Sequence, residues 1–526
     1  MSDALTPEEY PELVIGLAGP IGIDTETLTT VVKETLAEVE YQTEIIRLTN
    51  IMVTFNVAEK IPRDTDEEGF ASEVKYKINY ANKLREEKKD NAFLAKIAIA
   101  KIITERGSIQ RKSNGIAYII RQLKRPEEVN FLRKIYGNKF ILISAYAHKE
   151  GRINEITKKL KQSVPVSFQD PRIAFLVSSL IEKDENEGKN KYGQRLGDTF
   201  HLGDVFVDGI RRDKMYHTLR RFMQALFGRT DISPTKSEFG MFTAKSASLR
   251  STDLSRQVGA AIFSPSGEII SQGCNEVPKA NGGTYWDSEE PDFRDIKKGI
   301  DPNDRIKKEI IRDLFERLEN EGWLSEKALQ SGKSINDISL NSIKKGSGPL
   351  SGALITDLTE YGRVVHAEMC SICDAARSGR SVKGSTLFCT TFPCHNCTKH
   401  IIASGIKNVY YIEPYPKSRA KELHEDEISF EEIDEKKVSF VPFMGISPHF
   451  YKEIFEKNRR KNSDGTAKYW YSDTPKPQIE SFSTITESLE KLVTLSLFSE
   501  NEEQNSSTSD CYDKLLKLYH LITKKK

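Results

Sequence analysis

The sequence lacks any apolar run long enough to cross a bilayer, which argues against a membrane-spanning helix. Its first residues contain no basic segment followed by an apolar core, so no signal peptide is expected. Cysteine is scarce as well. Seven cysteines in 526 residues, an odd number in so long a chain, argue against a disulfide framework. These absences together predict a cytoplasmic protein without membrane contact.

The sequence also has no excess of charge of one sign. Lysine and arginine number 78 against 77 aspartates and glutamates, which gives a formal net charge of +1. No global field therefore attracts the chain to nucleic acid, and any such contact needs a local patch. A chain of 526 residues is long enough for two to four domains.

One stretch carries the residues of a metal site. It begins with His-Ala-Glu at 366–368 and ends with Pro-Cys-His-Asn-Cys at 393–397. One imidazole and two thiolates suit zinc, and three protein ligands leave a fourth position for water. This spacing is the known signature of zinc-dependent base deaminases. We therefore predict Zn²⁺ on His366, Cys394 and Cys397, with Glu368 moving protons to and from the water.

The same stretch indicates how the ligands are held. Apolar or small residues after His366 fit a helix that ends before Gly379, and a β-rich run at 385–391 precedes a second helix from Pro393. His366 would then lie in the first turn of one helix, and the two cysteines would lie one turn apart on the other. A helix N-terminus favours a thiolate.

A structural four-cysteine zinc site is the alternative, because Cys370-x2-Cys373 precedes Cys394-x2-Cys397. Cys370 and Cys373 fall inside the predicted helix among apolar residues, with no glycine to form a turn, and they resemble small buried apolar residues. This alternative also leaves the histidine and the glutamate unexplained. We favour the catalytic site.

The first half of the chain predicts a parallel α/β domain. Short apolar strands are expected at 12–18, 115–120, 140–145 and 204–207, alternating with helices. The first strand runs into a glycine-rich turn and a helix, an arrangement that can cradle phosphate. The candidate nucleotide-binding residues are Gly16, Gly19, Gly22, Asp24 and Thr25.

The Walker pattern of this turn is incomplete, because Ile23-Asp24 follows Gly22 where a lysine is required. Without that lysine, phosphoryl transfer lacks charge stabilisation, so we expect no appreciable kinase activity. Nucleotide binding and a plain turn of an α/β sheet remain equally good interpretations.

A second domain is predicted from about residue 234, with a hairpin of strands at 257–263 and 268–272. It contains Arg-Ser-x-Asp from Arg250, Gln-Val-Gly-Ala from Gln257 and Gly-x-Asn-x-x-Pro from Gly273. In this order, and followed by His-Ala-Glu and Pro-Cys-x-x-Cys, these motifs resemble the deoxycytidylate deaminases. The resemblance covers about 236–420, apart from one insertion.

That resemblance implies a cytidine-deaminase-like α/β/α domain that deaminates a deoxycytidine nucleotide, dCMP or dCTP. The substrate-binding residues it implies are Asn275, Ala367, Arg250, Ser251, Gln257 and Tyr415. A base deaminase acting on RNA or single-stranded DNA is the alternative. The near-neutral charge and the stretch Gly-Cys-Asn-Glu-Val-Pro at 273–278 favour a free nucleotide.

The order of the two domains adds a further resemblance. Residues 121–152 resemble the later half of nucleoside-monophosphate-type P-loop kinases. A degenerate P-loop kinase-like domain joined to a deoxycytidylate deaminase resembles the two-domain anti-phage deoxycytidylate deaminases of bacteria (the AvcD-like proteins). What this implies is depletion of the deoxycytidine nucleotide pool during infection, control by an inhibitory small RNA or a regulatory nucleotide, and a homo-oligomer, a hexamer.

We expect three parts: a P-loop-like domain at 1–233, a deaminase domain at 234–455 and a C-terminal extension at 456–526. The polar, low-complexity run at 501–509 is expected to be disordered. The insertion at about 277–360 holds a charged amphipathic helix near 306–318 and has no cysteine or histidine, which argues against a second zinc within it. It fits either a surface or oligomer contact or a regulatory nucleotide site.

Overall fold

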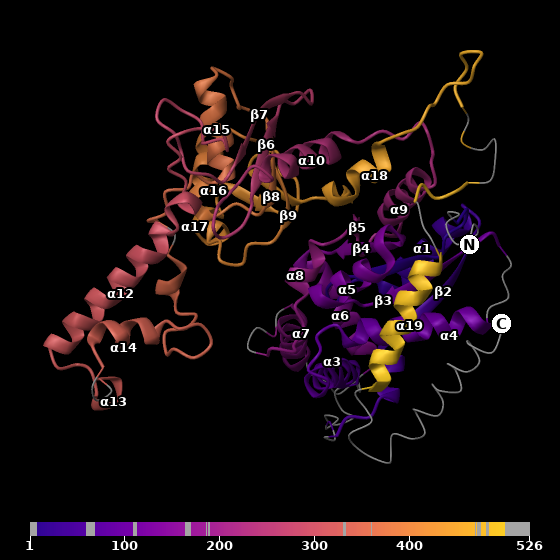
Figure 1. Cartoon of the computed structure of the whole chain (residues 1–526), viewed down its shortest axis with the longest axis horizontal. Helices are drawn as coiled ribbons and strands as arrows, with labels where there is room; N and C mark the ends of the chain where they lie inside the picture. The colour runs from indigo at the N-terminus through magenta and orange to yellow at the C-terminus, as the bar shows by residue number, and fades with distance from the viewer. Residues whose placement is uncertain are drawn as a thin grey trace. The chain divides into compact units, whose positions relative to one another are not determined.

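The computed structural model describes residues 8–58, 61, 69–108, 113–163, 170–185, 187, 190–329, 333–358, 360–468, 470, 475–479 and 483–499. The chain divides into two compact units (Figure 1). The first unit comprises Met1–Glu238 and Met444–Lys526, and the second comprises Phe239–Phe443. Each is built on a six-stranded sheet with helices, which confirms the predicted α/β class.

The sheet of the first unit has the order β12-β5-β4-β1-β3-β2. Its strands are β1 (Leu13–Ala18), β2 (Tyr41–Arg47), β3 (Gly115–Arg121), β4 (Phe140–Tyr146), β5 (Val205–Asp208) and β12 (Gly445–Ile446). All neighbours pair in parallel except β12, which is antiparallel to β5. The predicted strands correspond to β1, β3, β4 and β5, whose apolar runs are buried on both faces. The edge strand β2 was missed, because polar residues interrupt it.

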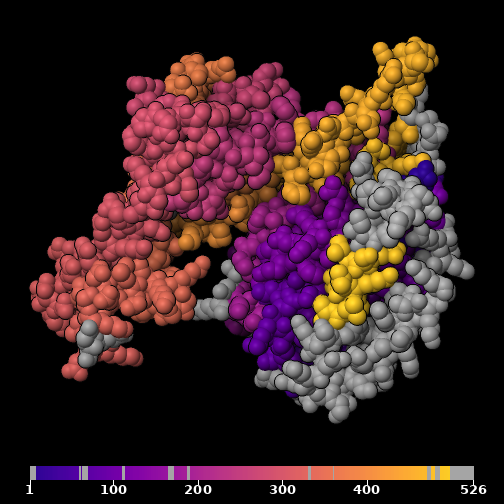
Figure 2. Space-filling model, viewed as in Figure 1, coloured from indigo at the N-terminus to yellow at the C-terminus, as the bar shows by residue number. Residues whose placement is uncertain are grey.

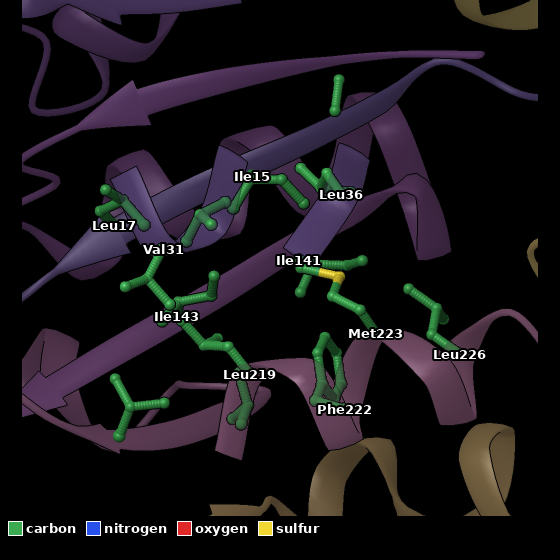
Figure 3. Close-up of a cluster of buried hydrophobic side chains, with 14 of the residues drawn as sticks. Ile15, Leu17, Val31, Leu36, Ile141, Ile143, Leu219, Phe222, Met223 and Leu226 are labelled. Carbon is green, nitrogen blue, oxygen red and sulfur yellow. The ribbon is translucent and has the colours of Figure 1, made fainter. Parts of the chain in front are cut away.

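Helices cover both faces of this sheet. On one face, α1 (Thr25–Ala37) and α9 (Arg212–Leu226) pack over β1 and β4, and Figure 3 shows side chains such as Ile15, Ile143 and Phe222 meeting there. The other face packs against α4 (Phe93–Ser108) and α5 (Pro126–Tyr136). The remaining helices on the 8–238 part are α2 (Leu48–Ile51), α3 (Phe70–Glu87), α6 (Lys149–Ser163), α7 (Asp170–Glu185) and α8 (Leu196–Phe200).

The C-terminal part of the chain returns to the first unit, so the division differs from the expected boundary at residue 455. The strand β12 extends the sheet beyond β5, and the Ser447 N–H donates to the Asp204 carbonyl at 2.9 Å. The short helix α18 (Tyr451–Phe455) buries Ile454 in the same core. Helix α19 (Ser483–Ser499), yellow in Figure 2, lies against α4 and α5. The run expected to be disordered, 501–509, lies outside the described residues.

The second unit has a mixed sheet of order β10-β11-β9-β8-β6-β7. Its strands are β6 (Gly259–Phe263), β7 (Ile269–Cys274), β8 (Thr386–Thr391), β9 (Asn408–Glu413), β10 (Ile428–Phe430) and β11 (Val438–Pro442). The predicted hairpin is confirmed as β6 and β7, and β8, β9, β11 and β10 run parallel to one another. Its helices outside the insertion are α10 (Lys236–Ser248), which begins just before this unit, α15 (Ala367–Arg377), α16 (His395–Ala403) and α17 (Ala420–His424).

The insertion is helical, as predicted. It contains α11 (Asp295–Lys298), α12 (Pro302–Asn320), α13 (Glu326–Leu329) and α14 (Ile335–Ser342). Helix α12 packs against α14 and buries only Ile311 of its own residues. Across the described part of the chain, no helix is both long and apolar enough to cross a membrane.

The buried ion pair of Arg85 and Glu128 gives a stability prediction for the first unit. The two side chains lie 2.7 Å apart and are almost fully buried, and Glu128 also accepts the N–H of Lys124 at the start of α5. Arg85→Met would leave the carboxylate unpaired, so we expect a loss of about 3–5 kcal/mol. Hydrogen exchange of β1 and β3 peptides across a urea series measures it.

Arg220→Met is the matched control. Its exposed pair with Glu38, also 2.7 Å long, should contribute about 1 kcal/mol or less. Equal losses in the two variants would contradict the expectation that burial makes the Arg85 pair costly to break.

Candidate active site

Two helix starts bring three metal-ligating side chains together. His366 is the N-cap residue of α15, and Cys394 is the N-cap residue of α16. The sulfurs of Cys394 and Cys397 lie 3.3 Å and 3.5 Å from Nδ1 of His366, and the three donor atoms lie within 4.8 Å of one another. Tetrahedral zinc bonded to sulfur and nitrogen holds its ligand atoms about 3.5 Å apart. The three residues therefore fit zinc.

The pKa values of the two thiols shift in opposite directions. A hydrogen bond from the Cys397 thiol lowers the pKa of Cys394, and the bond to His366 lowers it further against the effect of burial. The same bond, with burial, raises the pKa of Cys397. The backbone N–H of Cys397 also points to the sulfur of Cys394 at 3.4 Å. A thiolate, the form that binds metal, is thus stabilised at the start of α16.

Glu368 lies beside the metal-ligating group, in the first turn of α15. Its side chain is buried, with the residue 4% exposed, and burial raises its pKa above the ordinary value. A raised pKa suits a carboxyl group that must take up and release a proton near neutral pH. The position predicted for the proton-transfer group is therefore next to the predicted metal ligands.

The four-cysteine alternative is wrong. Cys370 lies on the buried side of α15 and Cys373 on its exposed side. Among the described residues, the group that could hold a metal consists of His366, Cys394 and Cys397 alone. Cys370 packs against β7 instead, where its Cβ lies 2.8 Å from the position of a Cβ added at Gly273.

A cavity of about 200 Å³ opens onto Glu368 and the metal-ligating group. Three of the six residues expected to bind substrate line it: Asn275, Ala367 and Tyr415. Asn275 is held on both sides, because its Oδ1 accepts the Val258 N–H at 2.7 Å and its Nδ2 donates to the Arg256 carbonyl at 2.8 Å. Its remaining amide hydrogen and lone pair are what it can offer a ligand.

The other three expected residues do not line the cavity. The hydroxyl of Ser251 donates to the Asn275 carbonyl, and Nε2 of Gln257 donates to the Ser251 carbonyl at 2.8 Å. Arg250 stacks on Trp286, with its guanidinium carbon 3.7 Å from the ring centroid, and donates to Thr284. These residues fix the loop that carries Asn275.

Sequence reasoning missed several residues that shape the cavity. Arg256 lines it, with its guanidinium 5.0 Å from the Tyr415 ring centroid and 3.3 Å from the Glu413 carboxylate. Asp295 and Asp301 of the insertion line it too. Arg256 is adjacent to the Gln-Val-Gly-Ala motif, which could have indicated it. No motif in the insertion distinguishes these two aspartates from its other acidic residues, because only the tertiary structure brings them to the cavity.

Buried Glu276 was also missed. It accepts the N–H and the hydroxyl of Thr252, at 2.9 Å and 2.7 Å, and its backbone bridges to Val365 just before His366. Glu276 thus links Thr252, in the segment that follows α10, to Val365, which precedes α15. Glu276 lies inside the Gly-x-Asn-x-x-Pro motif, which could have indicated that it belongs to the site.

The glycine-rich turn of the first unit follows β1 as predicted, but its donors are occupied from within. The Ile21 N–H donates to Asp184 at 2.6 Å, and Asp24 caps α1 by accepting the Thr27 N–H at 3.0 Å. Gly22 has a φ of +94°, and Gly16 lies within β1, where a side chain would meet Leu123 and Phe140. Gly19, Gly22 and Thr25 line a cavity at this turn.

The metal assignment predicts different outcomes for two cysteines. Cys394→Ser should lose most bound zinc, because a hydroxyl is a poor substitute for a thiolate ligand. Cys370→Ser should retain close to one zinc per chain, because its thiol is outside the group. Metal content of the purified variants measures both. Zinc loss from Cys370→Ser of the same size would restore the four-cysteine site.

Comparison with known proteins agrees with this geometry. The family model "Cytidine and deoxycytidylate deaminase zinc-binding region" matches residues 234–413. Deoxycytidylate deaminase of Enterobacteria phage T2 is 46% identical over 55 residues, 10% of this chain and 29% of that protein. ComE operon protein 2 of Bacillus subtilis is 35% identical over 125 residues, 20% of this chain and 66% of that protein. The chain thus spans less than a third of the phage relative.

A solved structure also resembles part of the chain. Shikimate kinase from Bacteroides thetaiotaomicron is 13% identical with a TM-score of 0.22, and the match covers 41% of this chain and 98% of that one. A score this low supports no conclusion about the fold. The family match and the geometry concern the same residues of the second unit. Residues 234–413 thus match a cytidine and deoxycytidylate deaminase zinc-binding region, and His366, Cys394 and Cys397 form the metal-ligating group within them.

Proposed function

We propose that this protein is a zinc-dependent hydrolase that deaminates deoxycytidine nucleotides to deoxyuridine nucleotides. The observation that carries the proposal is the buried carboxyl group of Glu368 beside His366, Cys394 and Cys397, at the end of a cavity large enough for a pyrimidine. Metal ligands, a proton carrier and a substrate space are thus together in one place.

The reaction replaces the amino group at C4 of cytosine with oxygen from water. Zinc in this site supplies a water molecule whose pKa is lowered towards neutrality. Glu368 accepts the proton that the water loses as its oxygen bonds to C4, and passes it to N3 of the ring. Glu368 then takes the proton of the new C4 hydroxyl and delivers it to the amino group, so the C4–N bond breaks as the C4 carbonyl forms and ammonia leaves. The backbone N–H of Ala367 binds the pyrimidine carbonyl.

The lining of the cavity favours a single nucleotide over a polynucleotide. Arg256 is the one lysine or arginine among its described lining residues, which also include Asp253, Asp295 and Asp301. One phosphate group can be held by Arg256, whereas a strand of nucleic acid needs a basic groove along its backbone. Asn275 is placed to contact the sugar or the base edge, and Tyr415 to pack against the base.

The biological setting rests on the resemblance to the two-domain bacterial deaminases alone. On that ground we propose that the protein drains the deoxycytidine nucleotide pool during phage infection. Control by an inhibitory small RNA or a regulatory nucleotide, and assembly as a hexamer, are parts of the same proposal.

Glu368→Gln should abolish turnover while leaving the metal in place. The amide keeps the size of the side chain but cannot carry a proton, so we expect a fall in kcat of about 10²–10⁴-fold at unchanged zinc content. Asp374→Asn is the control: this partly exposed residue of the same helix pairs with Arg377, and the variant should deaminate normally. A Glu368→Gln enzyme with near-normal turnover would rule out this role.

The substrate class is tested by incubating the zinc-loaded protein with dCMP, dCTP, CMP, CTP and cytosine-bearing oligonucleotides. Uracil products should form from the free deoxynucleotides. Arg256→Gln should raise KM for the nucleotide by about tenfold or more, since a hydrogen bond to a charged group is lost, with little effect on deoxycytidine. Product from oligonucleotides alone would reject the proposal in favour of a nucleic-acid deaminase.

A further inference from the structure

A second cavity lies inside the first unit, where β1, β2 and β3 end. Its volume is about 350 Å³, and its lining includes Ala18, Arg47 and Arg121 at the ends of those strands. Small-molecule sites commonly have volumes of roughly 300–1,000 Å³, and open α/β sheets bind ligands at the carboxyl ends of their strands. The position and size of the cavity therefore suit a small ligand.

Two arginines give this cavity a place for an anion. Arg47 and Arg121 are register partners on β2 and β3, so their side chains leave adjacent strands at the same level. Both pair with one carboxylate, that of Glu26, at 3.5 Å and 2.8 Å. The Glu26 side chain is 67% exposed, and Lys159 also lines the cavity. Two guanidinium groups on one exposed carboxylate leave a net positive charge that a phosphate group would match.

Gln194 provides a second, independent indication of a ligand. The residue lines the cavity and is 6% exposed, yet its Oε1 has no hydrogen-bond partner among the described residues. Buried polar atoms in proteins are nearly always hydrogen-bonded, so this acceptor calls for a donor from outside. Apolar side chains, among them Leu48, Val74 and Ile78, line the same space. A ligand with a flat ring that carries an N–H group could pack against these apolar side chains and donate to Oε1 of Gln194.

The glycine-rich turn lines one side of this cavity, but a carboxylate of the chain already binds one of its N–H groups. Asp184 accepts the Ile21 N–H, and its other oxygen pairs with Lys124 at 2.7 Å. Lys124 also donates to the Gly19 carbonyl at 2.8 Å, and Asp24 caps the helix that follows. Asp184 thus occupies two donors that a phosphate chain would otherwise use, the Ile21 N–H and the Lys124 ammonium group.

We propose that this cavity binds a nucleoside monophosphate, with its phosphate on Arg47 and Arg121 and a base N–H on Gln194. The turn takes no part in binding, so additional phosphates gain nothing and no phosphoryl transfer follows. This site is separate from the deaminase centre and does not depend on its activity.

The test uses the zinc-loaded full chain with AMP, GMP, CMP, UMP, their nucleosides, ATP, inorganic phosphate and a short RNA. At least one monophosphate at about 1 mM should protect peptides covering 44–52 and 190–196 from hydrogen exchange. Calorimetry should show that Arg47→Gln and Arg121→Gln each weaken binding about tenfold or more. The Arg47 side chain is exposed, so we expect the Arg47→Gln variant to fold. Gln194→Leu should weaken the monophosphate and the nucleoside alike. Arg220→Gln, exposed and absent from the cavity lining, should change nothing.

Several results would overturn the proposal. One is the absence of protection with all four monophosphates. Another is binding unaltered by the arginine and glutamine variants. ATP bound more than about tenfold tighter than AMP would show that the turn holds phosphates after all, and protection by RNA alone would identify a different class of ligand.

Discussion

Two thiols and a carboxyl group are buried beside the half-buried imidazole of His366 in the second unit. Like charges at such short range cannot all be present in a water-poor site unless a cation compensates them, and the opposed pKa shifts of Cys394 and Cys397 express this conflict. The N-termini of α15 and α16 relieve part of it with their free N–H groups. Zinc provides the remainder.

The backbone around this site explains why the helices start where they do. Strand β8 ends at Thr391, shortly before Cys394 caps α16, and Val365 is bridged to Glu276 just before His366 caps α15. The Glu276 carboxylate also binds Thr252, so this one buried residue links Thr252 through its side chain and Val365 through its backbone. The geometry of the catalytic group therefore depends on residues that never touch the metal.

The first unit also has a helix that begins after a parallel strand, but its N-terminal N–H groups have different partners. There the N–H groups meet carboxylates of the chain itself, Asp24 and Asp184, rather than an external anion. A neighbouring lysine, Lys124, neutralises Asp184 and closes the turn. Excess positive charge lies instead at the ends of β2 and β3, which moves the position suited to a phosphate away from the turn.

Most of the metal site could be predicted from the sequence, because its information is local. The spacing of His366, Glu368, Cys394 and Cys397 follows from one turn of each of two helices, and runs of buried apolar residues marked β1, β3 and β4. A strand in which polar and apolar residues are mixed, such as β2, has no apolar run that would predict it. The four-cysteine alternative could be rejected only once the faces of α15 were known.

What the tertiary structure alone determined are contacts between distant parts of the chain. Asp184 and Ile21 are 163 positions apart, and no spacing rule connects them. The return of residues 444–455 to the first unit, and the approach of Asp295 and Asp301 to the catalytic cavity, are of the same kind. The local sequence pattern determines whether a segment forms a helix or a strand. The pairing of polar groups that are distant in the sequence depends on tertiary packing, because a buried charge is stable only beside a partner that the fold places next to it.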